Sequence, residues 1–262
     1  MFTTDLTGKY ALIAGSTQGI GLATAQALAD LGATCILMAR NETALHAVLP
    51  SLSTNQQQQH RIVVADFQFP EQVQTAVVTT LQQSPIHILV NNSGGPAAGP
   101  IVDATTDAFI TTFQQHLIAN HILTTAVLES MKAAHYGRII NIISTSVKVP
   151  LKGLGVSNTI RGAVASWAKT MSIEVAPFGI TVNNVLPGAT ATGRLQAIIE
   201  NKSNKLQTSK EAVSEEMLAE IPAKRFGTPE EIANVVAFLA SPAASYVNGT
   251  SIPVDGGRTG AI

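Results

Sequence analysis

Three glycines near the N-terminus have the spacing of a phosphate-binding turn. Residues 11–14 form an apolar run of strand length, Gly15, Gly19 and Gly21 follow, and apolar residues then recur at helical spacing. A strand, a glycine turn and a helix point free backbone N–H groups at a phosphate, and glycine lets the backbone come close to it. The spacing differs from the Gly-x-Gly-x2-Gly dinucleotide fingerprint. A tight turn that binds nothing is therefore the alternative.

Other polar residues come directly after strand-like segments. Arg40 follows the second segment and could bind the 2′-phosphate of NADP, or simply lie on the surface beside a helix. Asp66 follows the third, and could accept a hydrogen bond from an adenine amino group or cap the helix that Pro70 begins. The polar, glycine-bearing turn at 91–96 follows the fourth segment and could let a ribose lie against its backbone, or be a plain turn.

The elements that would position these residues alternate along the whole chain. Strands are expected at 11–14, Thr34–Ala39, Arg61–Ala65, Ile86–Asn91, Arg138–Ile143, Thr181–Leu186 and Ser251–Val254, and helices include Pro70–Gln83, Thr106–Ala134, Val156–Ala176 and Pro229–Leu239. This alternation predicts an α/β fold, a doubly wound parallel sheet of Rossmann type with about seven strands. No linker divides the chain, so residues 1–262 are expected to form a single domain. Ligands of such sheets bind beyond the carboxyl ends of the strands.

Composition excludes several classes of protein. The 262 residues are 45% hydrophobic, and the net charge of −1 offers no electrostatic basis for binding nucleic acid or an anionic membrane. The single cysteine, Cys35, rules out an internal disulfide framework and is expected to be inert core. There is no signal pattern and no apolar run near the roughly 18 residues of a membrane span. We expect a cytoplasmic protein.

Taken together, these motifs resemble the short-chain dehydrogenase/reductase family over nearly the whole chain. The matching pieces are the glycine turn, Asp66, and residues 91–94, 137–144, 183–188, 225–231 and 255–257. The C-terminal part most resembles the 3-oxoacyl-carrier-protein reductase branch. The resemblance implies hydride transfer between a nicotinamide cofactor and a small carbonyl or alcohol substrate. Arg40 resembles the residue that favours NADP over NAD.

The resemblance also implies a set of cofactor contacts. They carry over onto Gly15, Ser16, Gln18, Gly19, Ile20, Gly21, Arg40, Asp66, Phe67, Asn92, Ser93, Gly94, Arg161, Pro187, Gly188, Thr190 and Thr192. In the family, the segment 187–192 holds the nicotinamide carboxamide. Residues 190–215 are expected to form a mobile substrate lid with an amphipathic helix.

The family's catalytic residues are only partly present. Ser144 matches the serine that polarises the carbonyl, but Ser157 stands at the position of the acid/base tyrosine and Arg161 at that of the lysine. The position of the supporting asparagine is assigned to His116, with Asn120 one turn away. We therefore expect Ser144, Ser157, Arg161 and His116 to form an atypical catalytic site, and we expect no metal.

These replacements have chemical consequences. A phenol has a pKa of about 10, whereas an alkyl hydroxyl is a much weaker acid. Arg161 can supply charge and bind ribose hydroxyls, but a guanidinium cannot relay a proton. His116 titrates near neutrality and could supply the proton, or could be a packed histidine. Lys148 and Lys152 could reach the carbonyl, or could be solvated loop residues.

Two main functions remain open. The first is an NADP-dependent reductase or dehydrogenase, with a substrate that could be 3-oxoacyl-like. The second is a catalytically silent homologue that binds dinucleotide and acts as a subunit, scaffold or redox sensor. A third, weaker alternative is other chemistry in the same pocket, such as dehydration.

The helix at 156–176 is apolar around much of its circumference, and such helices are buried. In the family, the helix that corresponds to 156–176 packs on a second subunit. We therefore expect a homo-oligomer, either a tetramer or a dimer.

Overall fold

The computed structural model describes residues 3–261, in which seven parallel strands form a sheet of order β3-β2-β1-β4-β5-β6-β7. The strands are β1 (Tyr10–Ala14), β2 (Thr34–Ala39), β3 (Arg61–Val64), β4 (Ile88–Asn91), β5 (Gly137–Ile142), β6 (Ile180–Pro187) and β7 (Ser251–Val254). The predicted alternation and the doubly wound sheet are confirmed. The strand order reverses between β1 and β4, and a crevice for ligands opens at such a point.

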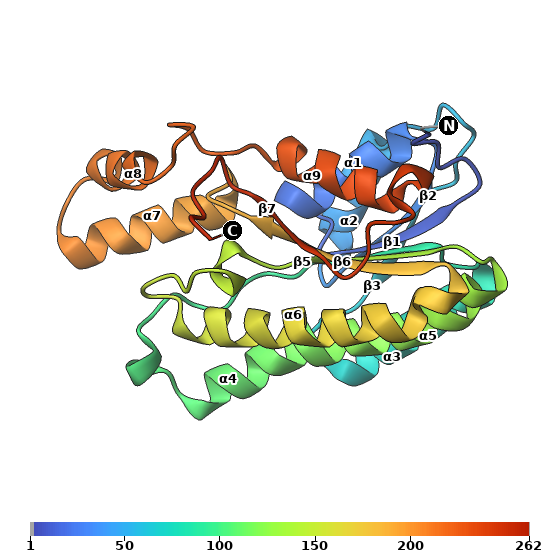
Figure 1. Ribbon diagram of the computed structural model, residues 1–262, viewed down its shortest axis with the longest axis horizontal. Coiled ribbons are helices and arrows are strands. Elements are labelled where there is room, and N and C mark those ends of the chain that lie inside the picture. The colour runs from blue at the N-terminus through green and yellow to red at the C-terminus, as the bar shows by residue number, and fades with distance from the viewer. Residues whose placement is uncertain (1–2, 262) are drawn as a thin grey trace.

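Helices cover both faces of the sheet (Figure 1). They are α1 (Gly19–Asp30), α2 (Glu42–Val48), α3 (Pro70–Gln83), α4 (Thr106–Phe113), α5 (Ala119–Ala133), α6 (Gly155–Val175), α7 (Gly193–Leu206), α8 (Lys210–Ala219) and α9 (Pro229–Ala240). Along β1, Ala11 and Ile13 belong to the core cluster under α1 and α9, while Leu12 and Ala14 belong to the one under α3, α5 and α6. Strand side chains alternate between faces, which is why a strand buried on both sides is continuously apolar.

Two helical predictions needed correction. The expected helix Thr106–Ala134 is interrupted by a π-helical turn at Gln114–Ile118, which carries His116. The expected lid is two helices rather than one, because Gln207 ends α7 in the left-handed conformation with φ 52°. Both helices lie together beyond one end of the sheet (Figure 1). Leu195, Ile199 and Val213 form a small core between them.

A ladder of polar side chains crosses four neighbouring strands of the sheet. Asn91 donates to Asn141 Oδ1 at 2.9 Å, Asn141 donates to Asn184 Oδ1 at 2.9 Å, and Asn184 donates to Ser251 Oγ at 3.0 Å. The three asparagines are buried. Because a buried amide is stable only when it is hydrogen-bonded, the ladder holds β4, β5, β6 and β7 in register.

Two further sequence expectations concern the class of protein. Cys35 is buried, and burial raises the pKa of its thiol, as expected of an inert core residue. Among residues 3–261, none of the helices combines the length and apolar character needed to cross a membrane.

Candidate active site

A large open cavity lies where the strands end. Residues one or two positions after the ends of six strands line it: Gly15, Arg40, Asp66, Asn92, Ser144 and Gly188. Of the residues that the sequence singled out as cofactor contacts, all but Ser16 line this cavity. The fold therefore brings together residues that are more than 170 positions apart in the chain, such as Gly15 and Gly188.

The glycine turn is packed too tightly for side chains. Gly15 and Gly19 have φ of +61° and +55°, which favours glycine. A Cβ atom on Gly21 would lie 2.1 Å from Gly15 O and 2.8 Å from Asn92 Nδ2. Asn92 in turn donates to Ala14 O at 3.3 Å and Gly15 O at 3.1 Å. The turn and the end of β4 thus form one rigid unit at the start of α1.

The cavity beside this unit has room for a dinucleotide. A Cβ atom on Gly94, which lines the cavity, would meet nothing within 4 Å. Thr192 comes from the segment after β6 and approaches the turn from the other side, with its Cγ2 3.3 Å from a Cβ atom on Gly19. Open space between backbone N–H groups and a hydroxyl-bearing segment suits a pyrophosphate and a ribose. The residues present fit a nicotinamide dinucleotide.

Arg40 and Asp66 lie at the far end of the cavity. Arg40 Nη1 is 3.8 Å from Asp66 Oδ2, and the arginine side chain is 72% exposed. Asp66 does not cap α3: it accepts from Gln68 N at 3.0 Å, and the helix begins after Phe69 without a side-chain cap. The carboxylate is thus available to the cavity, and the arginine is free to meet a phosphate.

Ser144 stands at the end of β5 with its proton available. Its Oγ accepts from Ser146 N at 3.1 Å at the start of a short turn. Because that bond uses a lone pair, the hydroxyl hydrogen can be donated into the cavity. Ser157, on the first turn of α6, lines the same cavity.

Arg161 joins α6 to the end of β5. Its Nη1 donates to Ile142 O at 3.1 Å and Ile143 O at 2.7 Å, and its Nε donates to Ser157 Oγ at 3.2 Å. Burial, then the charge of Arg194, lowers the pKa of Arg161 to about 10, so the guanidinium is charged at neutral pH. The guanidinium that was expected to bind ribose hydroxyls therefore donates largely to backbone carbonyl oxygens.

His116 lies behind the cavity rather than in its wall. It is 5% exposed, its Nδ1 is 2.9 Å from Ser93 Oγ, and its Nε2 is buried without a hydrogen-bond partner among the described residues. Burial and the charge of Arg161 lower the pKa of His116 to about 3, against a smaller opposing effect of a backbone hydrogen bond to Gly94. The expectation that it titrates near neutrality is wrong, and at pH 7 it is a neutral imidazole.

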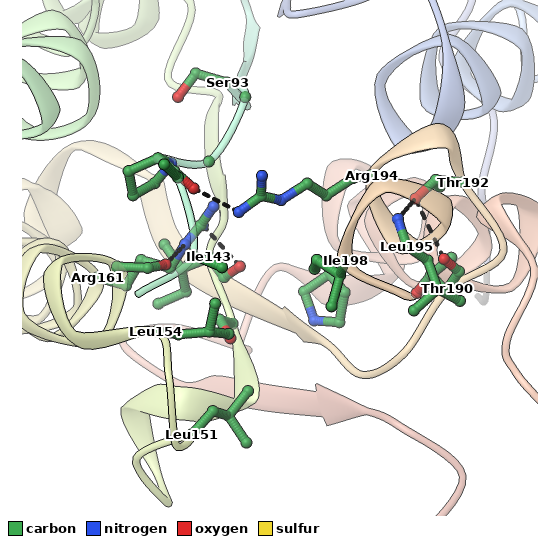
Figure 2. A pocket seen from close by; sticks show the side chains of 18 of the residues that line it. Ser93, Ile143, Leu151, Leu154, Arg161, Thr190, Thr192, Arg194, Leu195 and Ile198 are labelled. Carbon is green, nitrogen blue, oxygen red and sulfur yellow. Dashed lines mark hydrogen bonds between the residues drawn. The ribbon is translucent and has the colours of Figure 1, made fainter. Parts of the chain in front are cut away.

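Three other outcomes complete the site. Ser16 is fully buried, and its neighbour Thr17 lines the cavity in its place. Lys152 lines the cavity, whereas the exposed Lys148 does not. Arg194, which the sequence analysis did not single out, reaches across from α7 toward Arg161 (Figure 2). The only sequence signal for it is a basic residue two positions after Thr192.

Comparisons with known proteins agree with this geometry. The family model described as enoyl-(acyl carrier protein) reductase matches residues 14–259. The chain is 31% identical to NADPH-dependent reductase BacG of Bacillus subtilis, over 97% of this chain and 99% of that protein. It is 33% identical to 3-oxoacyl-[acyl-carrier-protein] reductase FabG of Vibrio cholerae, over 97% and 98%. The crystal structure of L-sorbose reductase from Gluconobacter frateurii, complexed with NADPH and L-sorbose, has a TM-score of 0.93 and 30% identity and covers 100% of both chains.

Proposed function

The chain belongs to the short-chain dehydrogenase/reductase family, and we propose that it transfers hydride between NADP(H) and a carbonyl or alcohol carbon of a small molecule. The observation that carries this proposal is that the glycine turn, Gly94 and the segment 187–192 line one cavity with Ser144. A protein that only bound a dinucleotide would not need a segment to hold the nicotinamide face-on. Its relatives include NADPH-dependent reductases, and nothing favours a silent scaffold.

The preference for NADP rests on Arg40. Its exposed guanidinium stands at the end of β2, where an NAD-binding site carries an acid that binds the ribose hydroxyls. Because Asp66 is 3.8 Å away, it partly balances the charge without closing off the arginine. A 2′-phosphate can therefore be met by Arg40 from the solvent side.

When bound, NADPH supplies the hydride, and the chain supplies orientation and charge. Ser144 donates its hydroxyl hydrogen to the substrate carbonyl oxygen. Arg161, charged and hydrogen-bonded to Ser157, favours negative charge developing on that oxygen. Thr190 and Thr192 hold the nicotinamide end in place through the segment after β6.

The proton comes from water rather than from His116. A histidine with a pKa of about 3 carries no proton to give at neutral pH. Ser157 is a weak acid by itself, but its oxygen can hold a water that reaches the substrate oxygen. The hydroxyl and the guanidinium together therefore position and polarise this water in place of a phenol.

Three broader features belong to the same proposal. Residues 190–215 act as a lid over the substrate, since α7 and α8 pack mainly on each other through their own core.

An apolar surface is available for a second copy of the chain in a homo-oligomer. It includes Ile173 on α6, which is 66% exposed, and Phe178, which is 40% exposed. The substrate carries its oxo group close to an acyl carbon, as the 3-oxoacyl substrate of the FabG relative does by name, and the protein acts in the cytoplasm.

The test is a turnover screen with NADPH over ketones, 3-oxoacyl thioesters and quinones. Ser144→Ala is expected to lower kcat by about 100-fold or more while NADPH affinity stays within 2-fold of wild type, because one oxyanion donor is lost. Ser146→Ala is the matched control. It lies on the same turn, its hydroxyl is buried without a partner among the described residues, and its backbone N–H, which Ser144 needs, is retained.

Two results would contradict the proposal. NADPH binding without consumption of NADPH across the whole screen would favour the silent homologue. Equal activity of Ser144→Ala and wild type would remove the serine from the chemistry. The double variant Ser157→Tyr with Arg161→Lys tests the replaced pair: a large gain on ordinary ketones would mean that the native pair is impaired there.

A further inference from the structure

Two arginines converge on one point of the cavity wall. From the position that a Cβ atom on Gly95 would occupy, Arg194 Nη2 is 3.4 Å and Arg161 Nη2 is 3.6 Å away. Arg194 extends from the first turn of α7 toward Arg161 on α6 (Figure 2). Its Nη2 is fixed there by donating to Pro96 O at 2.5 Å.

No acid among residues 3–261 balances this pair. Seven basic and four acidic side chains line the cavity, and three of the acids, Asp66, Glu216 and Glu220, pair with basic residues other than these arginines. Neither Arg161 nor Arg194 has a carboxylate within 4.0 Å in the described chain. Two unpaired guanidiniums side by side repel each other, and an anion between them would remove that repulsion.

The anion is not the cofactor's pyrophosphate. Arg161 is held to the end of β5, which is two strands from β1 and its glycine turn. Neighbouring strands are about 4.8 Å apart, so roughly 10 Å of sheet separates the two places. The arginine pair instead lies beside Ser157, at the reaction centre.

Part of the cavity wall near the pair is apolar. Leu151, Leu154 and Ile198 line the cavity from the loop before α6 and from α7 (Figure 2). A ligand that reaches both features carries a negative group close to its reacting carbon and an apolar substituent beyond it. A neutral ketone would leave the positive charge of the two guanidiniums without an anionic partner.

We propose that the substrate is a small oxo acid, whose carboxylate binds between Arg161 and Arg194 while its carbonyl faces Ser144. Arg194 is then a specificity-determining residue supplied by the lid. The inference rests on the proposed function, because it names the substrate class of the same site. The proposal also gives a role to Arg161 at the position where the family has a lysine. A planar guanidinium can donate to a carboxylate and to backbone carbonyls at the same time.

The experiment compares acids with their methyl esters. The probes are 2-oxobutanoate, 3-oxobutanoate and 4-oxopentanoate, each beside its ester, with NADPH at saturation. Wild type is expected to prefer an acid in kcat/KM. Arg194→Ala is expected to raise KM for that acid by about 10- to 100-fold, the value of a charged hydrogen bond, and KM for the ester by less than about 3-fold. Arg194→Lys should recover part of the loss.

Lys148→Ala is the control, because it removes an exposed cation near the site that does not line the cavity. It should leave both KM values unchanged. An equal loss for acid and ester in Arg194→Ala would overturn the proposal, and so would a loss of NADPH affinity with no change in substrate KM. Wild type that prefers none of the acids to its ester would also overturn it.

A binding arm separates this proposal from the proposed function. 3-Hydroxybutanoate or its methyl ester is titrated into the NADPH complex, where no hydride can be transferred, and heat is recorded. Tighter binding of the acid in wild type, lost in Arg194→Ala, supports the arginine pair even if no ketone is reduced. Equal binding of acid and ester refutes the anion site while leaving reductase activity on other ketones intact.

Discussion

Two glycines in the same cavity should respond in opposite ways to one added methyl group. A Cβ atom on Gly94 would meet nothing within 4 Å, whereas one on Gly21 would lie 2.1 Å from Gly15 O. Neither glycine has a left-handed backbone, so space alone decides the outcome. If the room at Gly94 belongs to the cofactor, Gly94→Ala harms binding and not folding.

The magnitudes follow from these contacts. Gly94→Ala should leave the free energy of unfolding unchanged or raise it by about 0.4–1 kcal/mol, because alanine has less freedom in the unfolded chain. It should weaken NADPH binding by about 1–3 kcal/mol, the cost of an extra methyl in a filled space, or roughly 5- to 150-fold in Kd. Gly21→Ala should destabilise the protein itself by about 3 kcal/mol, because backbone must move.

The assay pairs urea unfolding of the free protein with NADPH titration followed by nicotinamide fluorescence. Gly21→Ala should lower the unfolding midpoint before any ligand is added, and Gly94→Ala should not. Unchanged NADPH affinity in Gly94→Ala would refute the assignment of this space to the cofactor. A loss of stability in Gly94→Ala as large as that in Gly21→Ala would refute the geometric reasoning.

Three other outcomes can be tested independently. Asn141→Leu leaves Asn91 Nδ2 and Asn184 Oδ1 without partners and should lower the free energy of unfolding by about 2–5 kcal/mol in urea; an unmoved midpoint would contradict the ladder. His116 has a folded pKa of about 3 against 6.5 when unfolded, so its contribution to stability is present above pH 6.5 and is lost as pH falls toward 3. The difference in unfolding free energy between wild type and His116→Gln should then shift by up to about 1.4 kcal/mol per pH unit in that range, and parallel curves would contradict the burial effect. Arg40→Ala should weaken NADPH binding by about 10-fold and NADH binding hardly at all, and equal losses would remove the arginine from cofactor choice.

Much of the fold could be predicted from the sequence because it depends on local patterns. Apolar runs of strand length alternate with helical periodicity, and this alone predicts parallel strands with crossover helices. The glycine turn could be predicted from the sequence for the same reason. The amide ladder was not, since Asn91, Asn141 and Asn184 meet only through strand register, which no local pattern encodes.

The site was less predictable wherever burial or a turn decides the chemistry. The electrostatics of His116 depend on its burial and on Arg161, both of which come from the packing of α6 against the π-helical turn. The sequence of the turn did not predict which of the neighbouring side chains, Ser16 or Thr17, would face the cavity. Arg194 was missed because the direction of α7 is set by its start at Thr192, not by the helix's own sequence.

This cavity is proposed to carry out hydride transfer without the usual tyrosine and lysine. The direct measurement is a single turnover with protein in excess over NADPH that carries deuterium at both C4 positions, in the presence of the oxo acids named above and of the ketones and 3-oxoacyl thioesters of the turnover screen. Mass spectrometry should find one deuterium on the carbinol carbon of a product alcohol with wild type and almost none with Ser144→Ala. NADPH that binds with normal affinity yet transfers no deuterium to any of these substrates would contradict hydride transfer in this cavity.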